Sequence, residues 1–408
     1  MIFKKGSVNF VSIFLLVLIP LVIAIAIFAA NRIKKSSNQN LSCKDRDGSN
    51  FCERSLGDGL LSKPTTVQSP EPTVLPKTPT DVPQTNDGYN MKVLVIKYFP
   101  LIADGQKIDV SVTGDVGDTY RNVKQHTVDV TNNLVNALQK ATTYLGYKDS
   151  RAVPSLRYNI VDTKEFISAV PMFSDGTRKP DYYKLLSGVN ICDYVKNKGV
   201  NEVFLWAYQG PPFAGSQYPY LNISESKMAG PNGDISNSYR TNDMPKCDKT
   251  YRVYTFNYGR GTAEAMESWG HQLEAELSAV NSDLFRNKFQ GPNYPQKLNV
   301  NGRCGSVHNP PNAVQEYDRA NSAGHPSDCL DWNPDGLGSL SSISCSNWGC
   351  PNISDSNNGA LNYMIWNWQN LPGMNNTKTY QGKRLRNWWD VHSDFDNVLS
   401  NSRRLTAN

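Results

Sequence analysis

The runs VLVIKYF at residues 93–99 and VFLWA at residues 203–207 are short, apolar and rich in β-branched and aromatic side chains. Runs of this length predict strands that are buried on both faces. LRYNIV (156–161) and YRVYTFN (251–257) predict two more strands, and residues 132–145, 191–198 and 261–280 predict helices. Strands separated by helices indicate an α/β fold with a mainly parallel sheet flanked by helices.

The last hundred residues have a different composition. They hold six of the eight tryptophans and four of the eight cysteines, among many Asn, Gly and Ser residues. We therefore divide the globular part into an α/β domain over 89–300 and a loop-rich, disulfide-stapled cap subdomain over 301–408. We expect helices near 363–369 and 385–395. The tryptophans of the cap are either core residues or platforms for stacking sugars.

The N-terminal region predicts a membrane anchor and a stalk. After a short segment (1–8), residues 9–31 carry no charge and are long enough to span a lipid bilayer as one helix. The apolar region of a cleaved signal peptide is shorter. Residues 32–88 are rich in Pro and Thr, which favours an extended, semi-rigid stalk, and they include a small loop between Cys43 and Cys52.

Charge and cysteine usage indicate where the chain works. The net charge of +5 is matched by the five basic residues of the first 35 positions, so the rest is close to neutral and favours no nucleic-acid partner. All eight cysteines follow the anchor and no CxxC pair is present, which is typical of disulfides in an oxidising compartment. Cys345 and Cys350 are a natural local pair. We expect a single-pass membrane protein with its C-terminal domain outside the cytoplasm.

The segment YGRGTAEAMESWGHQLEAE (258–276) is the main candidate for chemistry. At 100° per residue, four polar side chains lie within roughly 80° of one another on the predicted helix: Glu264, Glu267, His271 and Glu274. A separate stripe would pack on the sheet: Met266, Trp269, Leu273 and Leu277.

Two interpretations of the polar stripe stay open. It is the solvated face of an ordinary helix, stabilised by i,i+3 and i,i+4 pairs, or it is part of a site. No Lys or Arg lies between Gly261 and Val280, so we expect a compensating cation. This cation is Arg260 or a more distant arginine, a divalent metal, or a basic group of a substrate.

A divalent metal, zinc or a similar ion, would take Glu267 and His271 as ligands. His308 in the stiff loop CGSVHNPPN (304–312) is the candidate third ligand, and His325 or Asp328 are alternatives to it. Glu264 or Glu274 would then act as catalytic base toward a bound water.

The segment DWNPDG (331–336) resembles the first half of a calcium loop. Asp331, Asn333 and Asp335 would supply the oxygens. The twelfth position is Ser342 instead of the usual glutamate, and an Asx-turn explains the same residues without calcium.

The runs FNYGRGTAEAMESWGHQLE, CGSVHNPPN and SDCLDW resemble a group of bacterial exported proteins. The resemblance covers the part of the chain after Val203. It implies export and brings no activity, cofactor or site residue with it.

These patterns favour a metal-dependent hydrolase that acts on an envelope or extracellular polymer. The alternative is a non-enzymatic surface module that binds a cell-envelope glycan or protein through its C-terminal tryptophans, stiffened by calcium. A metal-free glycosidase using two glutamates is a third variant, but its carboxylates must flank the scissile bond from two sides, which one helical stripe does not provide.

Overall fold

The computed structural model describes residues 88–114, 116–174, 180–208, 226–235, 240–292, 302–336, 338–350, 356–400 and 405–407. They all belong to one compact unit. The predicted N-terminal segment, the anchor over 9–31 and all but the last residue of the stalk lie outside these ranges. Within the ranges themselves, none of the helices has both the length and the apolar character needed to cross a bilayer.

A five-stranded sheet organises the fold. The spatial order of its strands is β2 (Leu156–Phe166), β1 (Tyr89–Tyr98), β3 (Glu202–Ala207), β5 (Tyr251–Asn257) and β4 (Ser226–Ala229). The first four strands are mutually parallel, and only β4 is antiparallel to its neighbour β5. The predicted α/β class with a mainly parallel sheet is therefore confirmed. The sequence analysis missed β4, because a four-residue strand containing Ser, Lys and Ala carries little β signal.

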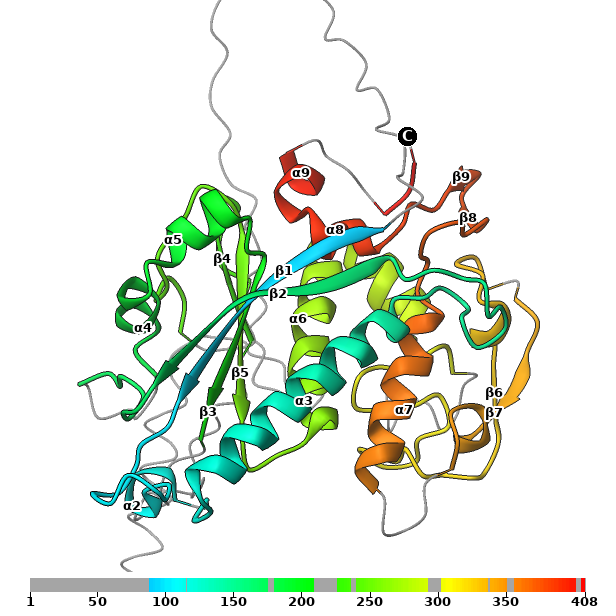
Figure 1. Ribbon diagram of the computed structural model, residues 1–408. Coiled ribbons are helices and arrows are strands. Elements are labelled where there is room, and N and C mark those ends of the chain that lie inside the picture. The colour runs from blue at the N-terminus through cyan, green and yellow to red at the C-terminus, as the bar shows by residue number, and fades with distance from the viewer. Residues whose placement is uncertain are drawn as a thin grey trace, which may run out of the picture. The chain divides into compact units, whose positions relative to one another are not determined.

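Helices cover both faces of the sheet (Figure 1). On one face lie α3 (Tyr120–Ala141) and α6 (Thr262–Ser282), and Trp206 of β3 donates a hydrogen bond of 2.8 Å to Thr131 of α3. On the other lie α4 (Tyr182–Gly188) and α5 (Ile191–Asp193), where the Tyr182 hydroxyl is 2.8 Å from Thr255 Oγ1 of β5. A short helix, α2 (Val110–Thr113), precedes α3, and the π-helical turn η1 (Tyr194–Lys198) follows α5.

The helix predicted over 132–145 differs from the observed α3 at both ends. Thr119 caps the helix by accepting a hydrogen bond from Asn122 N, so it starts at Tyr120. This first part is mostly polar, with few buried side chains, and gave no apolar periodicity. The helix ends at Ala141, and Leu145 has a φ of 51°, which is incompatible with a continuing helix.

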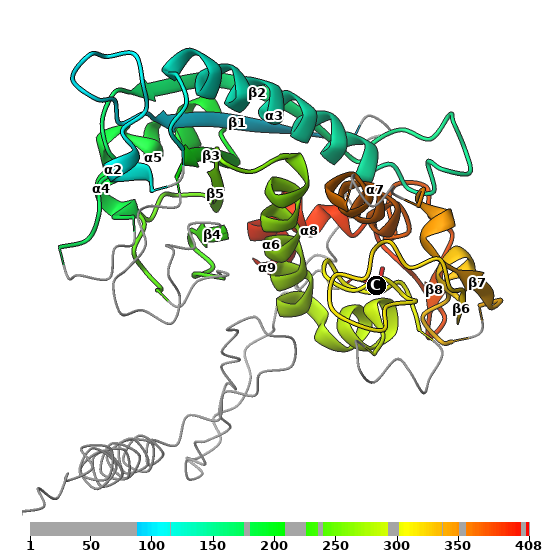
Figure 2. The same ribbon diagram turned by 90° about the horizontal axis from the view of Figure 1, so that it is seen from below.

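The C-terminal part packs beside α3 and α6 through α7 (Ser356–Gln369), as Figures 1 and 2 show. The π-helical η2 (Asp283–Gln290) follows a kink at Asn281 in α6. The remaining elements are short: β6 (His325–Ser327), η4 (Cys329–Asp331), β7 (Ser341–Ile343), η5 (Cys345–Asn347), β8 (Thr379–Tyr380), β9 (Lys383–Arg384), α8 (Trp389–Ser393) and α9 (Phe395–Ser400). Residues 385–388, predicted as helix, are not helical, because Leu385 forms a bridge with Thr406.

Disulfides join Cys192 to Cys247, Cys304 to Cys329 and Cys345 to Cys350. The last confirms the predicted local pair, and the first two could not be derived from spacing. The Cys43–Cys52 pair lies outside the described residues.

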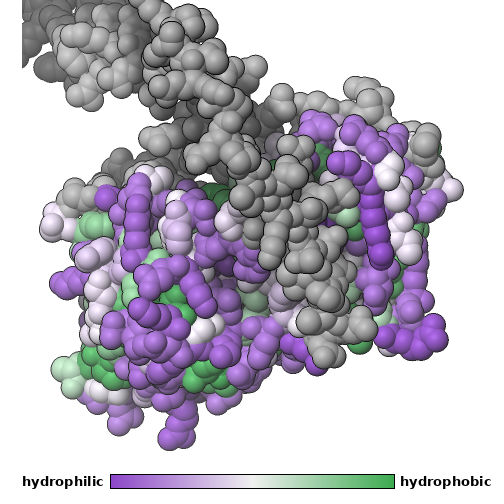
Figure 3. Space-filling model, turned by 90° about the horizontal axis from the view of Figure 1, so that it is seen from above, coloured by the Kyte–Doolittle hydropathy of each residue, from purple (hydrophilic) through white to green (hydrophobic). Residues whose placement is uncertain are grey.

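The six C-terminal tryptophans are core residues. Each is at most 7% exposed: Trp332, Trp348, Trp366, Trp368, Trp388 and Trp389. They give no support to an exposed stacking surface for sugars. Figure 3 shows one face of the molecule, on which hydrophilic side chains surround small hydrophobic patches.

Candidate metal centre

Helix α6 follows β5 after a short turn, and its N-terminus is fixed by Glu264. The Gly261 N–H donates to Glu264 Oε2 at 3.1 Å. The predicted apolar stripe of this helix is buried, each side chain being at most 1% exposed: Met266, Trp269, Leu273 and Leu277. The orientation of the helix therefore leaves Glu267 and His271 on the side that faces the loop over 302–324.

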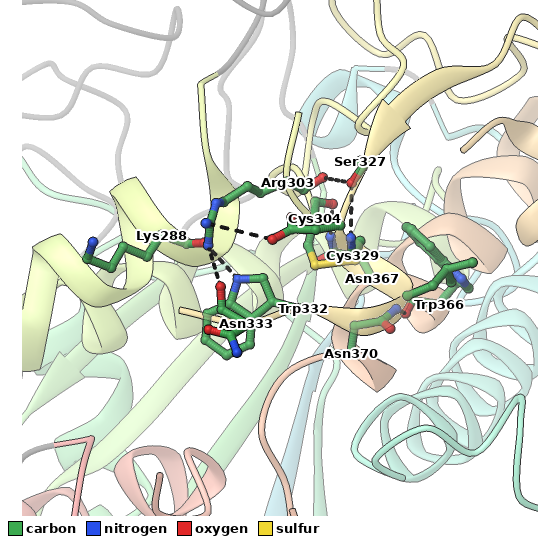
Figure 4. Close-up of a disulfide and its surroundings, with 12 residues drawn as sticks. Lys288, Arg303, Cys304, Ser327, Cys329, Trp332, Asn333, Trp366, Asn367 and Asn370 are labelled. Atoms are coloured by element: carbon green, nitrogen blue, oxygen red, sulfur yellow. Dashed lines mark hydrogen bonds and ion pairs between the residues drawn. A yellow bond between two sulfur atoms is a disulfide. The ribbon is translucent and has the colours of Figure 1, made fainter. Parts of the chain in front are cut away.

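That loop is held by contacts from three directions. The Cys304–Cys329 disulfide closes it, and Asn367 Nδ2 of α7 donates to Cys304 O at 2.6 Å (Figure 4). The Tyr363 hydroxyl donates to Ser306 O at 2.8 Å, and Val307 N donates to Glu274 Oε1 at 2.9 Å. His308 is thus presented by a fixed backbone, as metal ligands require.

Three of the predicted metal ligands meet. His308 Nε2 lies 3.0 Å from His271 Nε2 and 3.3 Å from Glu267 Oε1. The ligand atoms of Glu267, His271 and His308 all lie within 4.8 Å of one another, so this group could hold a metal ion. The three side chains are 22%, 20% and 14% exposed, which leaves the group reachable from solvent.

Arg319 supplies the distant cation that the acidic helix required. Its guanidinium donates to Glu267 Oε2 at 2.9 Å and to Val307 O at 2.8 Å. Burial raises the pKa of Glu267, but the hydrogen bond with His308 and the charge of Arg319 outweigh it and bring the pKa to about 2. The Glu267 carboxylate is therefore ionised, with Oε1 left facing the histidines.

Glu274 of α6 contacts both His271 of the same helix and the loop that carries His308. Its Oε1 accepts hydrogen bonds from Gln290 Nε2 at 2.6 Å and from Val307 N, while Oε2 lies 3.5 Å from His271 Nδ1. Burial raises the pKa of this carboxyl, and the interactions with His271 and Arg286 more than offset it, so the pKa is lowered. The assignment of Glu274 as catalytic base stays a prediction, but these contacts are those of a group that positions a ligand.

Glu264 lies in the first turn of α6, where its carboxylate accepts a hydrogen bond from the Gly261 N–H. A small pocket is found there, lined by Phe256, Asn257, Arg260, Gly261, Glu264, Ala265 and Ser268. Its role as a base also stays a prediction.

Tyr317 belongs to the site, although the sequence analysis did not assign it there. Its hydroxyl is 3.1 Å from His308 Nε2, and the two rings lie 4.5 Å apart. Burial and then the charge of Glu267 raise the pKa of the phenol to about 12. Its position two residues before Arg319 is the one sequence signal that could have linked these two residues to one site.

The two alternatives to His308 have other contacts. His325 Nε2 accepts from Gly302 N at 3.3 Å, and Asp328 Oδ2 lies 3.7 Å from an Arg303 nitrogen. His308 is the loop residue that reaches His271.

The candidate calcium residues form a turn. Asn333 Oδ1 accepts from Asp335 N at 2.9 Å, which is the Asx-turn alternative. Asp331 accepts from Ser339 N at 3.1 Å and lies 3.5 Å from Lys378 Nζ. The turn alone explains the contacts of these residues. Calcium binding by them stays a prediction.

A second cluster of charges, which the sequence analysis missed, lies under α6 and is fully buried. His392 of α8 places Nε2 2.6 Å from Glu202 Oε1 and Nδ1 3.0 Å from Glu276 Oε2. Arg252 of β5 donates to both oxygens of Glu276, at 2.5 and 2.9 Å. The available signal for this cluster was Arg252, a charged residue within the predicted strand over 251–257. A charge on a buried strand needs a buried partner of opposite charge.

Comparison with known proteins adds nothing to this geometry: neither a family model nor a curated protein matches the chain.

Proposed function

We propose that this protein is a metal-dependent hydrolase of an envelope or extracellular polymer, tethered to the membrane by residues 9–31 and acting outside the cytoplasm. The observation that carries the proposal is the convergence of Glu267, His271 and His308. Two imidazoles and one carboxylate are a donor set of catalytic zinc sites, which keep a further position for water or substrate.

The distances within the group support Zn²⁺. At Zn–N and Zn–O bonds of about 2.0–2.1 Å, neighbouring ligand atoms of a tetrahedral site are separated by roughly 3.3 Å. The two distances from His308 Nε2, 3.0 Å to His271 and 3.3 Å to Glu267, are close to this value. A ring nitrogen either donates one hydrogen bond or accepts one. His308 Nε2 has three polar neighbours, and one proton on this atom cannot serve all three, whereas a shared cation would interact with the whole group.

Each neighbouring residue then has a stated task. Arg319 holds Glu267 Oε2, which directs Oε1 toward the ion. Glu274 faces His271 Nδ1 and binds the backbone N–H of Val307 beside His308, so it positions two ligands. When bound, Zn²⁺ supplies a Lewis acid and lowers the pKa of a coordinated water to about 7.

The location outside the cytoplasm rests on other observations. Three disulfides within the described ranges fit an oxidising compartment. The uncharged run at 9–31 and the Pro/Thr-rich stalk would hold the domain away from the bilayer, where it would meet envelope or extracellular polymers.

The test is metal binding by the full-length protein purified in mild detergent. We expect stoichiometric Zn²⁺ by elemental analysis and titration calorimetry. His271→Ala should weaken binding by more than about 100-fold, beyond the 10–100-fold typical of outer-shell changes. His126→Ala, on α3, is the matched control and should bind like the wild type. Polymer hydrolysis that is lost with a chelator and restored by Zn²⁺ would complete the case, whereas Zn²⁺ binding that survives His271→Ala would refute the site.

A further inference from the structure

The hydroxyl of Tyr317 and the two other candidate ligands lie at similar distances from His308 Nε2. From His308 Nε2 it is 3.1 Å to the Tyr317 hydroxyl, 3.0 Å to His271 Nε2 and 3.3 Å to Glu267 Oε1. All three values are close to the roughly 3.3 Å that separates neighbouring ligands of a tetrahedral zinc ion. The phenol oxygen is therefore close enough to the candidate ligand atom of His308 to share an ion with it.

The backbone holds Tyr317 in this position at the expense of local strain. Its φ is 59°, in the left-handed region, which is unfavourable for a bulky side chain. Tyr317 O accepts a hydrogen bond from Arg319 N at 2.7 Å, and Arg319 in turn binds Glu267. This turn brings the phenol and the guanidinium to the site together. Such strain persists where the surroundings fix a residue, and it is concentrated at functional sites.

The side chain is nevertheless free to leave. Tyr317 is 48% exposed, and its ring contacts His308 on one side and the Arg319 guanidinium, 5.0 Å from the ring centroid. A rotation about its side-chain bonds would carry the hydroxyl into solvent without moving the backbone.

We propose that Tyr317 occupies the fourth coordination position of the metal at rest and that an oxygen of the substrate displaces it. The inference rests on the metal site proposed above and adds its regulation: the resting site is closed by a side chain of the protein. Entry of substrate then requires competition with a tethered ligand, which disfavours water and small anions.

The experiment measures access to the metal directly. Full-length protein loaded with Co²⁺ is titrated with azide, and binding is followed by the visible absorption of the cobalt ion. Because a tethered phenol competes at a high effective concentration, Tyr317→Phe should bind azide roughly tenfold more tightly than the wild type. Tyr317→Phe keeps the ring and its packing, so the fold is retained. Tyr183→Phe, an exposed tyrosine of α4, is the control and should match the wild type.

The outcomes separate the two proposals. Co²⁺ binding with equal azide affinity in the wild type and Tyr317→Phe would overturn the role of Tyr317 and leave the metal site intact. Absence of Co²⁺ binding by the wild type would overturn the metal site itself, and the role of Tyr317 with it.

Discussion

Glu274 connects the two candidate histidine ligands. It faces His271 across 3.5 Å and binds the backbone N–H next to His308 at 2.9 Å, so one side chain orders both histidines. A carboxylate behind a histidine selects the tautomer with hydrogen on Nδ1, which leaves the Nε2 lone pair for a metal. Metal affinity should therefore depend on the charge of Glu274 as well as on the ligands.

We predict that Glu274→Gln lowers Zn²⁺ affinity by about 10–100-fold. The amide can donate to His271 Nδ1, which favours the tautomer with hydrogen on Nε2 and blocks the ligand atom. Titration calorimetry measures the affinity, and ¹⁵N NMR of the metal-free protein reports the tautomer. Glu264→Gln is the control, because the amide oxygen of Gln can also accept from the Gly261 N–H. An unchanged tautomer and unchanged affinity in Glu274→Gln would contradict the positioning role.

In helix α6, the features that could be predicted are those that depend on spacing within the helix itself. Its periodicity predicted 261–280, and regular geometry ends at Asn281, where the kink begins. The i,i+4 spacing placed Glu267 and His271 on one side in advance. The close approach of α7 was not predictable, since it depends on Gly270 facing the Trp368 indole and the loop that carries His308.

We predict that Gly270→Ala destabilises the protein by about 1–3 kcal/mol, the usual cost of adding a methyl group to a packed interior. The new Cβ would lie 2.8 Å from Val307 Cγ2 and still closer to the Trp368 ring. Chemical denaturation measures the free energy of unfolding. Gly188→Ala at the end of α4 is the matched control, because a Cβ there meets nothing within 4 Å. Equal stability of the Gly270 variant and the wild type would show that α7 shifts without cost.

At the scale of the whole molecule, one buried network joins the sheet, α6 and α8. Glu202 comes from β3, Arg252 from β5, Glu276 from α6 and His392 from α8, and all four are at most 2% exposed. An imidazole that donates to two carboxylates carries both N–H groups and hence a positive charge, which the raised pKa of His392 favours. The hydroxyls of Tyr158 and Tyr254 are buried near this network, and burial followed by the charge of Glu202 raises the pKa of both phenols.

This network predicts a definite pH dependence of stability. Burial lowers the pKa of His392, but Glu276 and Glu202 outweigh it and raise the pKa above its ordinary 6.5. The stabilisation is therefore complete below 6.5 and is lost as the pH rises through the elevated value. For Glu276, burial raises the pKa, but Arg252 and His392 bring it to about 2, so its contribution is lost only as the pH falls from 4.5 toward 2.

Unfolding free energies from pH 5 to 9 test this. The wild type should lose stability above pH 6.5, whereas His392→Gln should be less stable at pH 5 by about 3–5 kcal/mol and lack that slope. His126→Gln serves as the control. A wild-type stability that stays level or rises between pH 6.5 and 9 would contradict a charged His392.

The sequence by itself determined the α/β class, the four parallel strands, the orientation of α6 and the pairing of Glu267 with His271. These features depend on spacings of a few residues, which the periods of helix and strand fix locally. It also offered His308, but only beside His325 and Asp328.

Only the tertiary structure decided which of these three residues lies beside Glu267 and His271. His308 lies 37 residues from His271 and reaches it because Cys304–Cys329, Tyr363 and Glu274 fix its loop. The same holds for Tyr317, Arg319 and the partners of His392, which come from separate elements. Contacts between distant segments arise from packing and closure of loops, and no periodicity within the chain encodes them.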